Sequence, residues 1–293
     1  MTWPVVSVVI PVHNEGQRLF LTLEALRGST AVPHEVVVVD DGSTDGGADF
    51  LRNAPELYPN VSLLTQTQHG VAAARNTGAR TVEAPLILFM DAHCFPSFGW
   101  LEKLVPVASS ADTGIAAPCI SVAGAKGQRG FGLTFASEEL DVEWLGKQGD
   151  APYEVPLAGG GCMLMRRDVF WSLGAFDSMR RYGVEDIEIS IRAWLAGFSV
   201  VMVPQVEVGH IFKEECNFRV EWRDYLYNLL RLIILHFEGA RLKRLMEPLR
   251  EKGCFPEALT ELLAGDLWDR YAFIRSKRIR NADWLCERFA FPF

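Results

Sequence analysis

Residues 86–93 read LILFMDAH, an apolar run that stops at an acidic residue. Residues 36–43, VVVVDDGS, follow the same plan, and the run VVSVVI at residues 5–10 is closed by Pro11. Short continuous apolar runs rich in β-branched residues and bounded by turn formers are typical of strands buried on both faces. These three stretches predict the centre of a sheet.

Helix-like segments separate these strands. Residues 17–28 and 70–80 carry apolar side chains at helical spacing, Asp45 is placed to start another helix, and residues 61–64 predict a further strand. Strands that alternate with helices indicate parallel pairing, with helices covering both faces of the sheet. The fold class is therefore α/β.

The pattern loosens after about residue 120. Residues 156–165, PLAGGGCMLM, predict a glycine turn that feeds a strand, and residues 200–203 predict a strand that ends at Pro204. Short helices are expected over residues 168–173 and 187–195. The glycine-rich, basic residues 124–132 predict a mobile loop that closes over a ligand.

The last part of the chain is predicted to be mostly helical, with breaks at Pro248, Gly253 and Pro256. Its most apolar stretch, residues 225–237, is too short to span a membrane and contains Arg231. We expect residues 1–215 to form one domain, with a nucleotide-binding half (1–120) and an acceptor and catalytic half (121–215). Residues 216–293 are expected to form a helical extension.

Composition narrows the functional classes. The 293 residues are 49% hydrophobic and 23% charged, and the formal net charge is −8, which argues against a nucleic-acid partner. No basic leader precedes the first apolar run, and no window approaches a transmembrane segment. The cysteines form no CxxC pair, so we expect reduced thiols and a cytoplasmic protein. They are Cys94, Cys119, Cys162, Cys216, Cys254 and Cys286.

Polar residues follow three of the predicted strands: residues 13–15 (HNE), residues 40–41 (DD) and residues 91–93 (DAH). In open α/β sheets, ligands bind beyond the carboxyl ends of the strands. Turn chemistry alone explains any one of these groups as readily as a binding site does. Three together indicate a ligand crevice.

The strongest local signal is a candidate metal site. Asp91 and His93 stand two residues apart, so in an extended segment both side chains project to the same side. His210, in VEVGHIF, is the third candidate ligand. Such a set suits Mn²⁺, with Mg²⁺ as an alternative and Zn²⁺ a weaker one, because no paired thiolates lie nearby. The structural alternative is a helix-capping aspartate beside a core histidine.

A second signal is the acidic pair Glu185 and Asp186, which follows Gly183 and precedes a predicted helix. Acidic residues are favoured at helix N-termini, which explains one of the two without any function. Two behind a flexible glycine favour a catalytic role, in which a carboxylate serves as general base. Arg75 either faces donor phosphates, locks Asp91 in an ion pair or is merely solvated. Gly159–Gly161 permits the close approach of a ligand or simply makes a tight turn.

Several segments, in this order, resemble known enzymes. SVVIPVHNE, VVVVDDGSTD, GVAAARNTGA and ILFMDAHC resemble the nucleotide-binding half of family 2 and related glycosyltransferases. PLAGGGCMLMRRDVF, GAFD, YGVEDIEISIRAWLAGFSVVMVP and VGHIFK resemble the catalytic half of polypeptide N-acetylgalactosaminyltransferases. The resemblance covers residues 5–213. It implies the Rossmann-like GT-A fold, with a mixed central sheet and a C-terminal helical extension.

The resemblance also implies roles for matching positions. Asp41 would contact the nucleotide base, in a pocket lined by Pro11, His13 and Glu15. Arg75 and Ala92 would lie near the donor, and Gly159, Gly160 and Gly161 near the transferred sugar. Asp91, His93 and His210 would bind the metal, and Glu185 would meet the sugar or the acceptor.

One departure from the pattern bears on mechanism. The N-acetylgalactosaminyltransferases, which retain anomeric configuration, have Glu-Asn where this chain has Glu185–Asp186, and many inverting family 2 enzymes use the Asp of such a pair as base. We therefore expect a metal-dependent transferase that takes a sugar from a nucleoside diphosphate donor, most simply a UDP-sugar. Inversion with Asp186 as base is favoured over retention. A nucleotidyltransferase could share the sheet and the metal, and a nucleotide-sugar-binding scaffold could share the fold without catalysis.

The acceptor is an open question: a peptide, a glycan or a small aglycone offering a hydroxyl or thiol. The resemblance favours a Ser, Thr or Cys side chain. The sequence shows neither the membrane anchor nor the carbohydrate-binding module of the animal enzymes, so we expect a soluble, bacterial-type enzyme. The aromatic residues Trp222, Tyr225, Tyr227 and Phe237 either line an acceptor groove or, as helical spacing favours, pack into the core.

Overall fold

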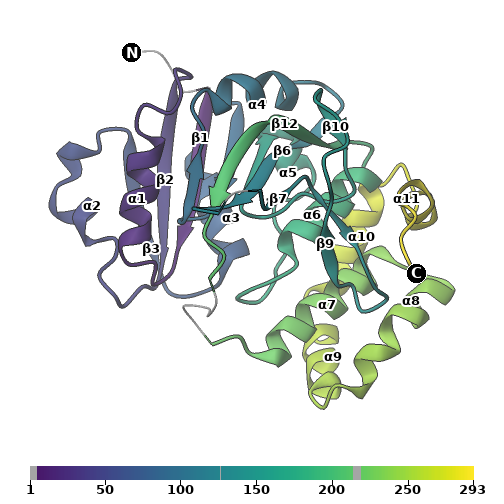
Figure 1. The fold of residues 1–293 in the computed structure, drawn as a ribbon. Coiled ribbons are helices and arrows are strands. Elements are labelled where there is room, and N and C mark those ends of the chain that lie inside the picture. Colours follow the sequence, from purple (N-terminus) through teal and green to yellow (C-terminus); the bar gives the residue numbers. More distant parts are fainter. Residues whose placement is uncertain (1–4, 126, 214–218) are drawn as a thin grey trace.

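The computed structural model describes residues 5–125, 127–213 and 219–293. A twisted central sheet carries helices on both faces, and a group of helices lies at one end of the molecule (Figure 1). Among the described residues, no helix combines the length and the apolar character that crossing a membrane requires.

The first half of the sheet is parallel. The four predicted strands are present as β1 (Val6–Val12), β2 (His34–Asp41), β3 (Val61–Gln66) and β4 (Leu86–Met90). β1 lies between β2 and β4, and β3 pairs with the outer edge of β2. Their carboxyl ends therefore meet at one edge of the sheet.

The second half makes the sheet mixed. β11 (Cys162–Arg166) runs antiparallel between β4 and β6 (Thr113–Val122), whereas β12 (Ser199–His210) is parallel to β6. The strand order along the main path is β10-β12-β6-β11-β4-β1-β2-β3. The short strands are β5 (Cys94–Pro96), β7 (Arg129–Gly130) and β10 (Tyr153–Glu154) in this sheet, and the separate hairpin of β8 (Leu133–Phe135) and β9 (Val142–Trp144). The mixed sheet that the GT-A resemblance implied is confirmed, and so is the parallel pairing predicted for the strands of the first half.

Two layers of helices bury the two faces. Val8 and Ile10 of β1 belong to one apolar cluster with α1 (Gln17–Leu26) and α4 (Trp100–Ala108). Val9 belongs to the other cluster, where it packs so tightly on α3 (Val71–Thr81) that a Cβ at Gly78 would lie 2.5 Å from Val9 Cγ1. Successive strand residues thus face opposite layers, as a doubly covered sheet requires.

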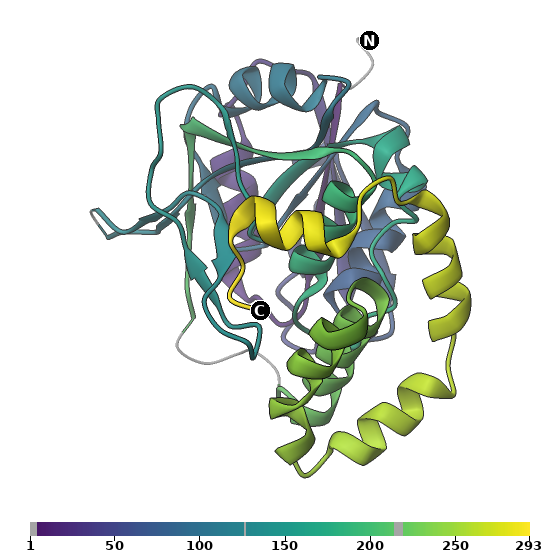
Figure 2. The ribbon, with the colours of Figure 1, turned by 90° about the vertical axis from the view of Figure 1, so that its right-hand side faces the viewer.

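The C-terminal helices lie against the second face, beside α6 (Glu185–Leu195) (Figure 2). The apolar cluster that contains Val9 continues through them to Phe293. They are α7 (Trp222–His236), α8 (Gly239–Met246), α9 (Phe255–Leu263), α10 (Leu267–Lys277) and α11 (Ala282–Phe289). The expected domain boundary at residues 215/216 and the predicted thiol of Cys216 lie outside the described residues; the described cysteines are free.

Several boundaries differ from expectation. The helix expected to start at Asp45 is α2 (Asp49–Asn53), because the Asp45 carboxylate instead accepts the backbone N–H groups of Gly16 (2.7 Å) and Gly47 (2.9 Å). The strand expected to end at Pro204 continues to His210, since a shift of register between Val203 and Glu207 accommodates the proline.

Other elements lie close to their predicted positions. α5 (Arg167–Ser172) and α6 occur as expected, although α6 begins at Glu185, two residues early. Within the glycine-rich residues 124–132, Arg129–Gly130 pairs with β6 rather than forming a free loop. Pro248 starts a 3-10 turn (Pro248–Glu251), and Pro256 sits in the first turn of α9, where its missing N–H is harmless.

Candidate active site

One cavity of about 490 Å³ lies beyond the carboxyl ends of β1, β2 and β4. The residues that the sequence assigned to donor binding, metal binding or catalysis line it, whereas Asn14 and Asp40 of the strand-end groups are not among the lining residues. The lining candidates are Pro11, His13, Glu15, Asp41, Arg75, Asp91, Ala92, His93, Gly159, Gly160, Gly161, Glu185, Asp186 and His210. The polar groups that follow the three strands thus share one crevice.

The candidate metal ligands converge on one point of this cavity. One donor atom from each of Asp91, His93 and His210 can be chosen so that all lie within 4.8 Å of one another. His210 Nε2 lies 3.5 Å from Asp91 Oδ2, and the two imidazole centroids are 4.6 Å apart. His210 arrives from far along the chain because β12 pairs with β5, which places His210 opposite Cys94.

The surroundings of these three side chains fit a bound cation. His210 turns its Nε2 toward Asp91, and its buried Nδ1 has no hydrogen-bond partner among the described residues, while His93 Nδ1 faces the Glu15 carboxylate. A Cβ at Gly161 would lie 3.0 Å from His210 Cδ2, so the glycine leaves the space that the ligands occupy. Burial would raise the pKa of Asp91, but the contacts with His210 and Arg75 hold that pKa well below its usual range. Asp91 is thus kept anionic, as a metal ligand must be.

Arg75 joins the metal side of the cavity to the acidic side. Its side chain is 1% exposed and donates to Asp91 Oδ1 (2.9 Å) and Glu185 Oε1 (2.8 Å). It also donates to the carbonyl of Gly160 (2.7 Å). The structure shows the predicted ion pair of Arg75 with Asp91, and the side chain is not solvated. Glu185 is a partner that the sequence did not reveal.

The acidic pair divides into a buried and an accessible member. Glu185 is buried against Arg75, whereas Asp186 is partly open to the cavity. Burial and the adjacent Asp186 carboxylate raise the pKa of Glu185 to about 7, against the opposing charge of Arg75. Burial also raises the pKa of Asp186. Asp186 accepts from the N–H groups of Gly160 (2.7 Å) and Ile187 (2.9 Å), which orient it.

The glycine run serves packing as well as approach to a ligand. A Cβ at Gly160 would lie 3.0 Å from Asp186 Oδ2, and one at Gly159 would lie 3.0 Å from the Trp144 ring. The backbone of residues 159–161 therefore passes directly between the acidic pair and the metal ligands.

The opposite end of the cavity is lined by Pro11, His13 and Asp41. The Asp41 carboxylate accepts from Gln66 Nε2 (2.7 Å) and from the N–H groups of His69 (2.8 Å) and Gly70 (2.7 Å). These hydrogen bonds show that the Asp41 carboxylate stabilises the turn that leads into α3. His13 Nδ1 lies 2.8 Å from the Asp41 carbonyl oxygen.

Glu15 lines the cavity with Pro11 and His13, and its carboxylate also lies beside the candidate metal ligand His93. It is 3.3 Å from His93 Nδ1 and accepts from Lys213 Nζ at 2.6 Å. Burial would raise the pKa of Glu15, but His93 and Lys213 lower it. Glu15 is therefore placed to orient His93, as partners of metal-bound histidines do.

Sequence reasoning missed other lining residues. Trp144, Phe212 and Lys213 line the cavity, with Phe212 packed against His210 (centroids 4.4 Å apart) and near Trp144 (6.3 Å). The position of Phe212 and Lys213 just after the VGH motif is a signal that was available. Trp144 ends a hairpin whose strands are too short to show a pattern.

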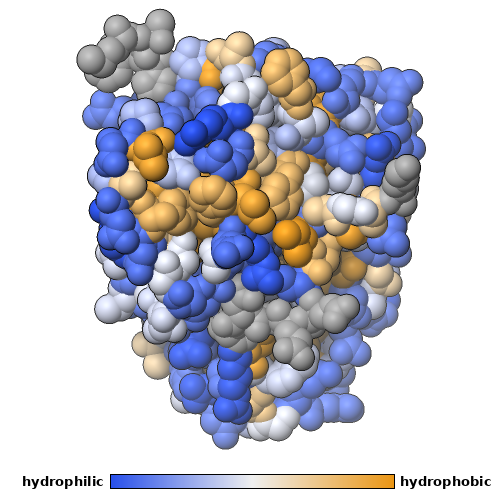
Figure 3. All heavy atoms as spheres, turned by 60° about the vertical axis from the view of Figure 1, so that its left-hand side comes forward, coloured by the Kyte–Doolittle hydropathy of each residue, from blue (hydrophilic) through white to orange (hydrophobic). Residues whose placement is uncertain are grey.

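The aromatic residues of α7 and its C-terminal end divide between the two expected roles. Tyr225 lines the cavity, whereas Tyr227 and Phe237 are buried in the core and Trp222 is 74% exposed. Figure 3 shows that apolar residues also reach the surface, in a band across the middle of one face.

Two curated relatives are similar to this chain in sequence. Polypeptide N-acetylgalactosaminyltransferase 8 of Drosophila melanogaster is 30% identical over 244 residues, which are 75% of this chain and 40% of that protein. Human polypeptide N-acetylgalactosaminyltransferase 10 is 29% identical over 241 residues, with 75% and 40% covered. The chain thus spans about two fifths of the length of these curated relatives.

Solved structures share the fold. A structure of GalNAc-T7 with UDP, GalNAc and Mn²⁺ superposes with a TM-score of 0.81 at 23% identity, over 98% of this chain and 56% of that one. The mannosyltransferase PcManGT of Pyrobaculum calidifontis, in complex with GDP-Man and Mn²⁺, gives 0.59 at 20% identity, over 94% and 74%. S. aureus TarS 1-349 with UDP-GlcNAc gives 0.60 at 17% identity, over 98% and 92%.

The model of the family described as "Glycosyl transferase family 2" matches residues 7–174, more than half of the chain. This match includes β1, β2, β4 and β11, and with them Asp41, Asp91, His93 and the glycine run. The chain belongs to glycosyl transferase family 2.

Proposed function

We propose that this protein transfers a sugar from a nucleoside diphosphate sugar to an acceptor hydroxyl or thiol, with a divalent metal bound by Asp91, His93 and His210. The observation that carries the proposal is that these three residues share one cavity with Glu185 and Asp186. A metal site and a candidate base side by side are what sugar transfer from a diphosphate needs.

The donor is a UDP-sugar in this proposal, because two of the three superposed structures contain UDP or a UDP-sugar and one contains GDP-Man. The metal is Mn²⁺, which accompanies the nucleotide in two of them. When bound, the cation offsets the negative charge that develops on the departing diphosphate.

In the favoured mechanism, Asp186 removes the proton of the acceptor hydroxyl or thiol as that atom bonds to the sugar's anomeric carbon. The bond from this carbon to the diphosphate oxygen breaks, and its electron pair leaves with the nucleoside diphosphate. The carboxylate of Asp186 is open to the cavity and is oriented by two backbone N–H groups. Displacement on the opposite face inverts the anomeric centre.

Retention is the second candidate, in the form of N-acetylgalactosamine transfer to peptide Ser or Thr. The similarity to the polypeptide N-acetylgalactosaminyltransferases over three quarters of the chain favours it. Those proteins are much longer than the matched segment, so the acceptor class is not transferred with the similarity. The anomeric configuration of the product, read by NMR, separates the two mechanisms.

The test is release of nucleoside diphosphate from UDP-GalNAc, UDP-GlcNAc and GDP-Man, with Mn²⁺ or with chelator. Metal-dependent release from at least one donor is the expected result. His210→Ala should lose it, whereas the control His34→Ala, at the opposite end of β2, should keep it. Metal-dependent donor binding without turnover, even in the presence of peptide and glycan acceptors, would support a sugar-binding scaffold instead. Release of pyrophosphate from UTP and a sugar 1-phosphate, without turnover of these donors, would indicate a nucleotidyltransferase.

A further inference from the structure

The loop of residues 180–184 directly precedes the acidic pair and forms part of the cavity wall. Its backbone is strained at two residues, because φ is +36° at Arg181 and +64° at Val184; glycine at position 183 adopts its φ of +100° without strain. Arginine and valine rarely adopt positive φ, and such residues persist only where their surroundings hold them. Something must therefore fix this loop.

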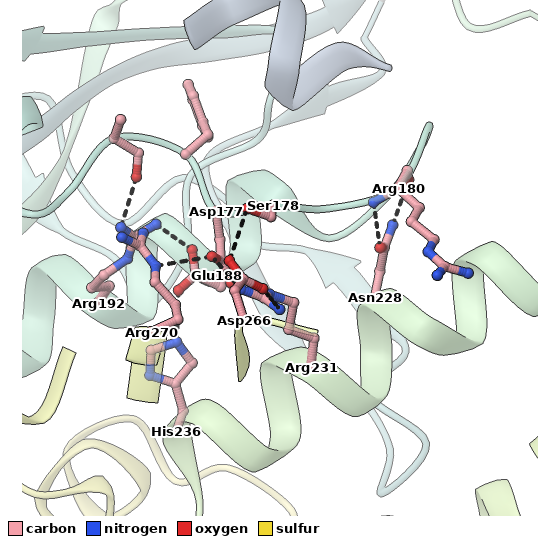
Figure 4. A network of polar contacts seen from close by, with 12 residues as sticks. Asp177, Ser178, Arg180, Glu188, Arg192, Asn228, Arg231, His236, Asp266 and Arg270 are labelled. Carbon is pink, nitrogen blue, oxygen red and sulfur yellow. Dashed lines mark hydrogen bonds and ion pairs between the residues drawn. The ribbon is translucent and has the colours of Figure 1, made fainter. Parts of the chain in front are cut away.

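One buried side chain of the C-terminal helices provides that support. Asn228 of α7 is 0% exposed, and its Oδ1 accepts from the Arg180 N–H at 2.7 Å. Its Nδ2 donates to three backbone carbonyls, those of Arg180 (2.7 Å), Tyr182 (3.0 Å) and Gly183 (3.2 Å). Figure 4 shows Asn228 reaching from α7 to the backbone of Arg180. A single amide thus takes the place of a regular hydrogen-bond ladder for the loop.

The loop is held from two sides. On the side of α3, the Val71 N–H donates to the Arg181 carbonyl at 3.0 Å, and a Cβ at Gly70 would lie 2.4 Å from Arg181 Cα. On the side of α7, a Cβ at Gly183 would lie 2.8 Å from the ring of Tyr225. Tyr225 and Asn228 are three residues apart and so share one face of α7.

The helix that carries Asn228 is itself fixed. Three residues further along α7, buried Arg231 donates to both oxygens of Asp177 (2.7 and 3.1 Å) and to Asp266 of the extension (2.8 Å). At the end of α7, His236 Nε2 lies 2.8 Å from Glu188 on α6, the helix that begins with Glu185. These contacts form the network in Figure 4.

We propose that Asn228 is a positioning residue: it holds the strained loop of residues 180–184 and thereby places Glu185 and Asp186 for reaction. The C-terminal helices then contribute to the active site by positioning its acidic pair. The inference rests on the proposed function for its catalytic part, while the placement of the loop can be measured independently of activity.

The test compares Asn228→Ala and the milder Asn228→Ser with a control, Leu235→Ala, which removes a buried side chain two turns along the same helix. Amide hydrogen exchange over residues 180–187 reports the loop directly. Asn228→Ala should speed exchange there by about tenfold or more, with Asn228→Ser intermediate. Leu235→Ala, compared at a similar loss of Tm, should leave this segment protected.

Turnover gives the second readout. Asn228→Ala should lower kcat by about 10- to 100-fold because the acidic pair is misplaced. The Kd for UDP-sugar with Mn²⁺ should change by less than about threefold, since the candidate metal ligands lie on other elements. Unchanged exchange in the loop, or an equal loss in Leu235→Ala, would overturn the inference. An inactive wild-type enzyme with the expected exchange pattern would count against the proposed function and leave the placement of the loop by Asn228 supported.

Discussion

The cavity has two halves that are built in different ways. The metal half holds the candidate metal ligands Asp91, His93 and His210, and the acidic half holds Glu185 and Asp186. Asp91 and His93 follow the end of a buried parallel strand, and His210 lies in β12, which pairs with the segment just after them. Glu185 and Asp186 follow a loop of left-handed residues that is held by α3 and by the C-terminal helices. Sheet geometry fixes the metal half, whereas tertiary contacts fix the acidic half.

Arg75 is the one described side chain that pairs with both halves. A site built this way separates two tasks. The rigid strand ends suit binding of metal and donor, and the acidic half, which depends on distant support, suits the placement of a proton acceptor. Variants of each half should therefore fail in different ways.

The largest effect is expected on the metal side. His210→Ala should lower turnover by about a thousandfold or more, because the charge on the departing diphosphate loses its counter-ion. Mn²⁺ binding, measured by electron paramagnetic resonance with the donor nucleotide present, should weaken in parallel. Full Mn²⁺ affinity in His210→Ala would remove this residue from the ligand set.

The next effect is expected for the candidate base. Asp186→Asn should lower kcat by about 10²- to 10³-fold, since the amide keeps the shape of the side chain but cannot accept the acceptor proton. Asp168→Asn, an exposed acid in the first turn of α5, is the matched control and should retain wild-type turnover. A fully active Asp186→Asn enzyme would exclude inversion with this residue as base.

The pH profile sharpens the account of the acidic pair. Because burial raises the pKa of Asp186, kcat should rise with pH as this carboxylate loses its proton. Below the pKa of Asp186, kcat should fall about tenfold per pH unit. Burial and the Asp186 carboxylate raise the pKa of the neighbouring Glu185 to about 7, so the two acids titrate as a pair, and Glu185→Gln should reduce the profile to a single inflection. A profile that is flat from about pH 5 to 8 in the wild type would rule out a raised pKa at the base.

The smallest effect on turnover, but a large one on stability, is expected behind the site. Glu188 on α6 is fully buried between Arg192 and His236, so Glu188→Ala leaves an unpaired buried charge and should cost about 3–5 kcal/mol in urea unfolding. The matched surface pair Glu138–Arg244 is exposed, and Glu138→Ala should leave the urea midpoint unchanged.

This buried pair also gives stability a pH dependence. Burial would raise the pKa of Glu188, but Arg192 and His236 hold it below the ordinary 4.5. Its contribution is therefore present above that value and is lost as the pH falls. Unfolding measured between about pH 7 and pH 3 should show a smaller loss of stability in Glu188→Gln than in the wild type. Equal losses would mean that Glu188 is not ionised in the folded protein.

The metal half could be predicted from the sequence because it depends on local geometry. The strand pattern places Asp91 and His93 at the correct edge of the sheet. The extended segment that the spacing assumed is wrong, because Ala92 and His93 form a turn between β4 and β5. The route of His210 was only partly visible. A proline such as Pro204 normally ends a strand. No local sequence pattern predicts the shift of register by which β12 continues past Pro204 to His210.

The support of the acidic half could not be predicted. Asn228 looks like an ordinary polar residue in an amphipathic helix, and its partners are backbone atoms 45 to 48 residues earlier in the chain. The position of Trp144 was equally hidden, because the three-residue strands of its hairpin show no alternation. Contacts of this kind follow from the packed fold and have no sequence pattern of their own.

The most direct measurement is a calorimetric titration of UDP-sugar in the presence of Mn²⁺, carried out on the wild type, His210→Ala and Asp186→Asn. Substitutions in the two halves of the cavity should have different effects on donor binding. Asp186→Asn should bind the donor within about threefold of the wild-type Kd, whereas His210→Ala should lose metal-dependent binding. Equal binding by both variants, or equal loss in both, would contradict a cavity that divides metal-assisted donor binding from proton removal.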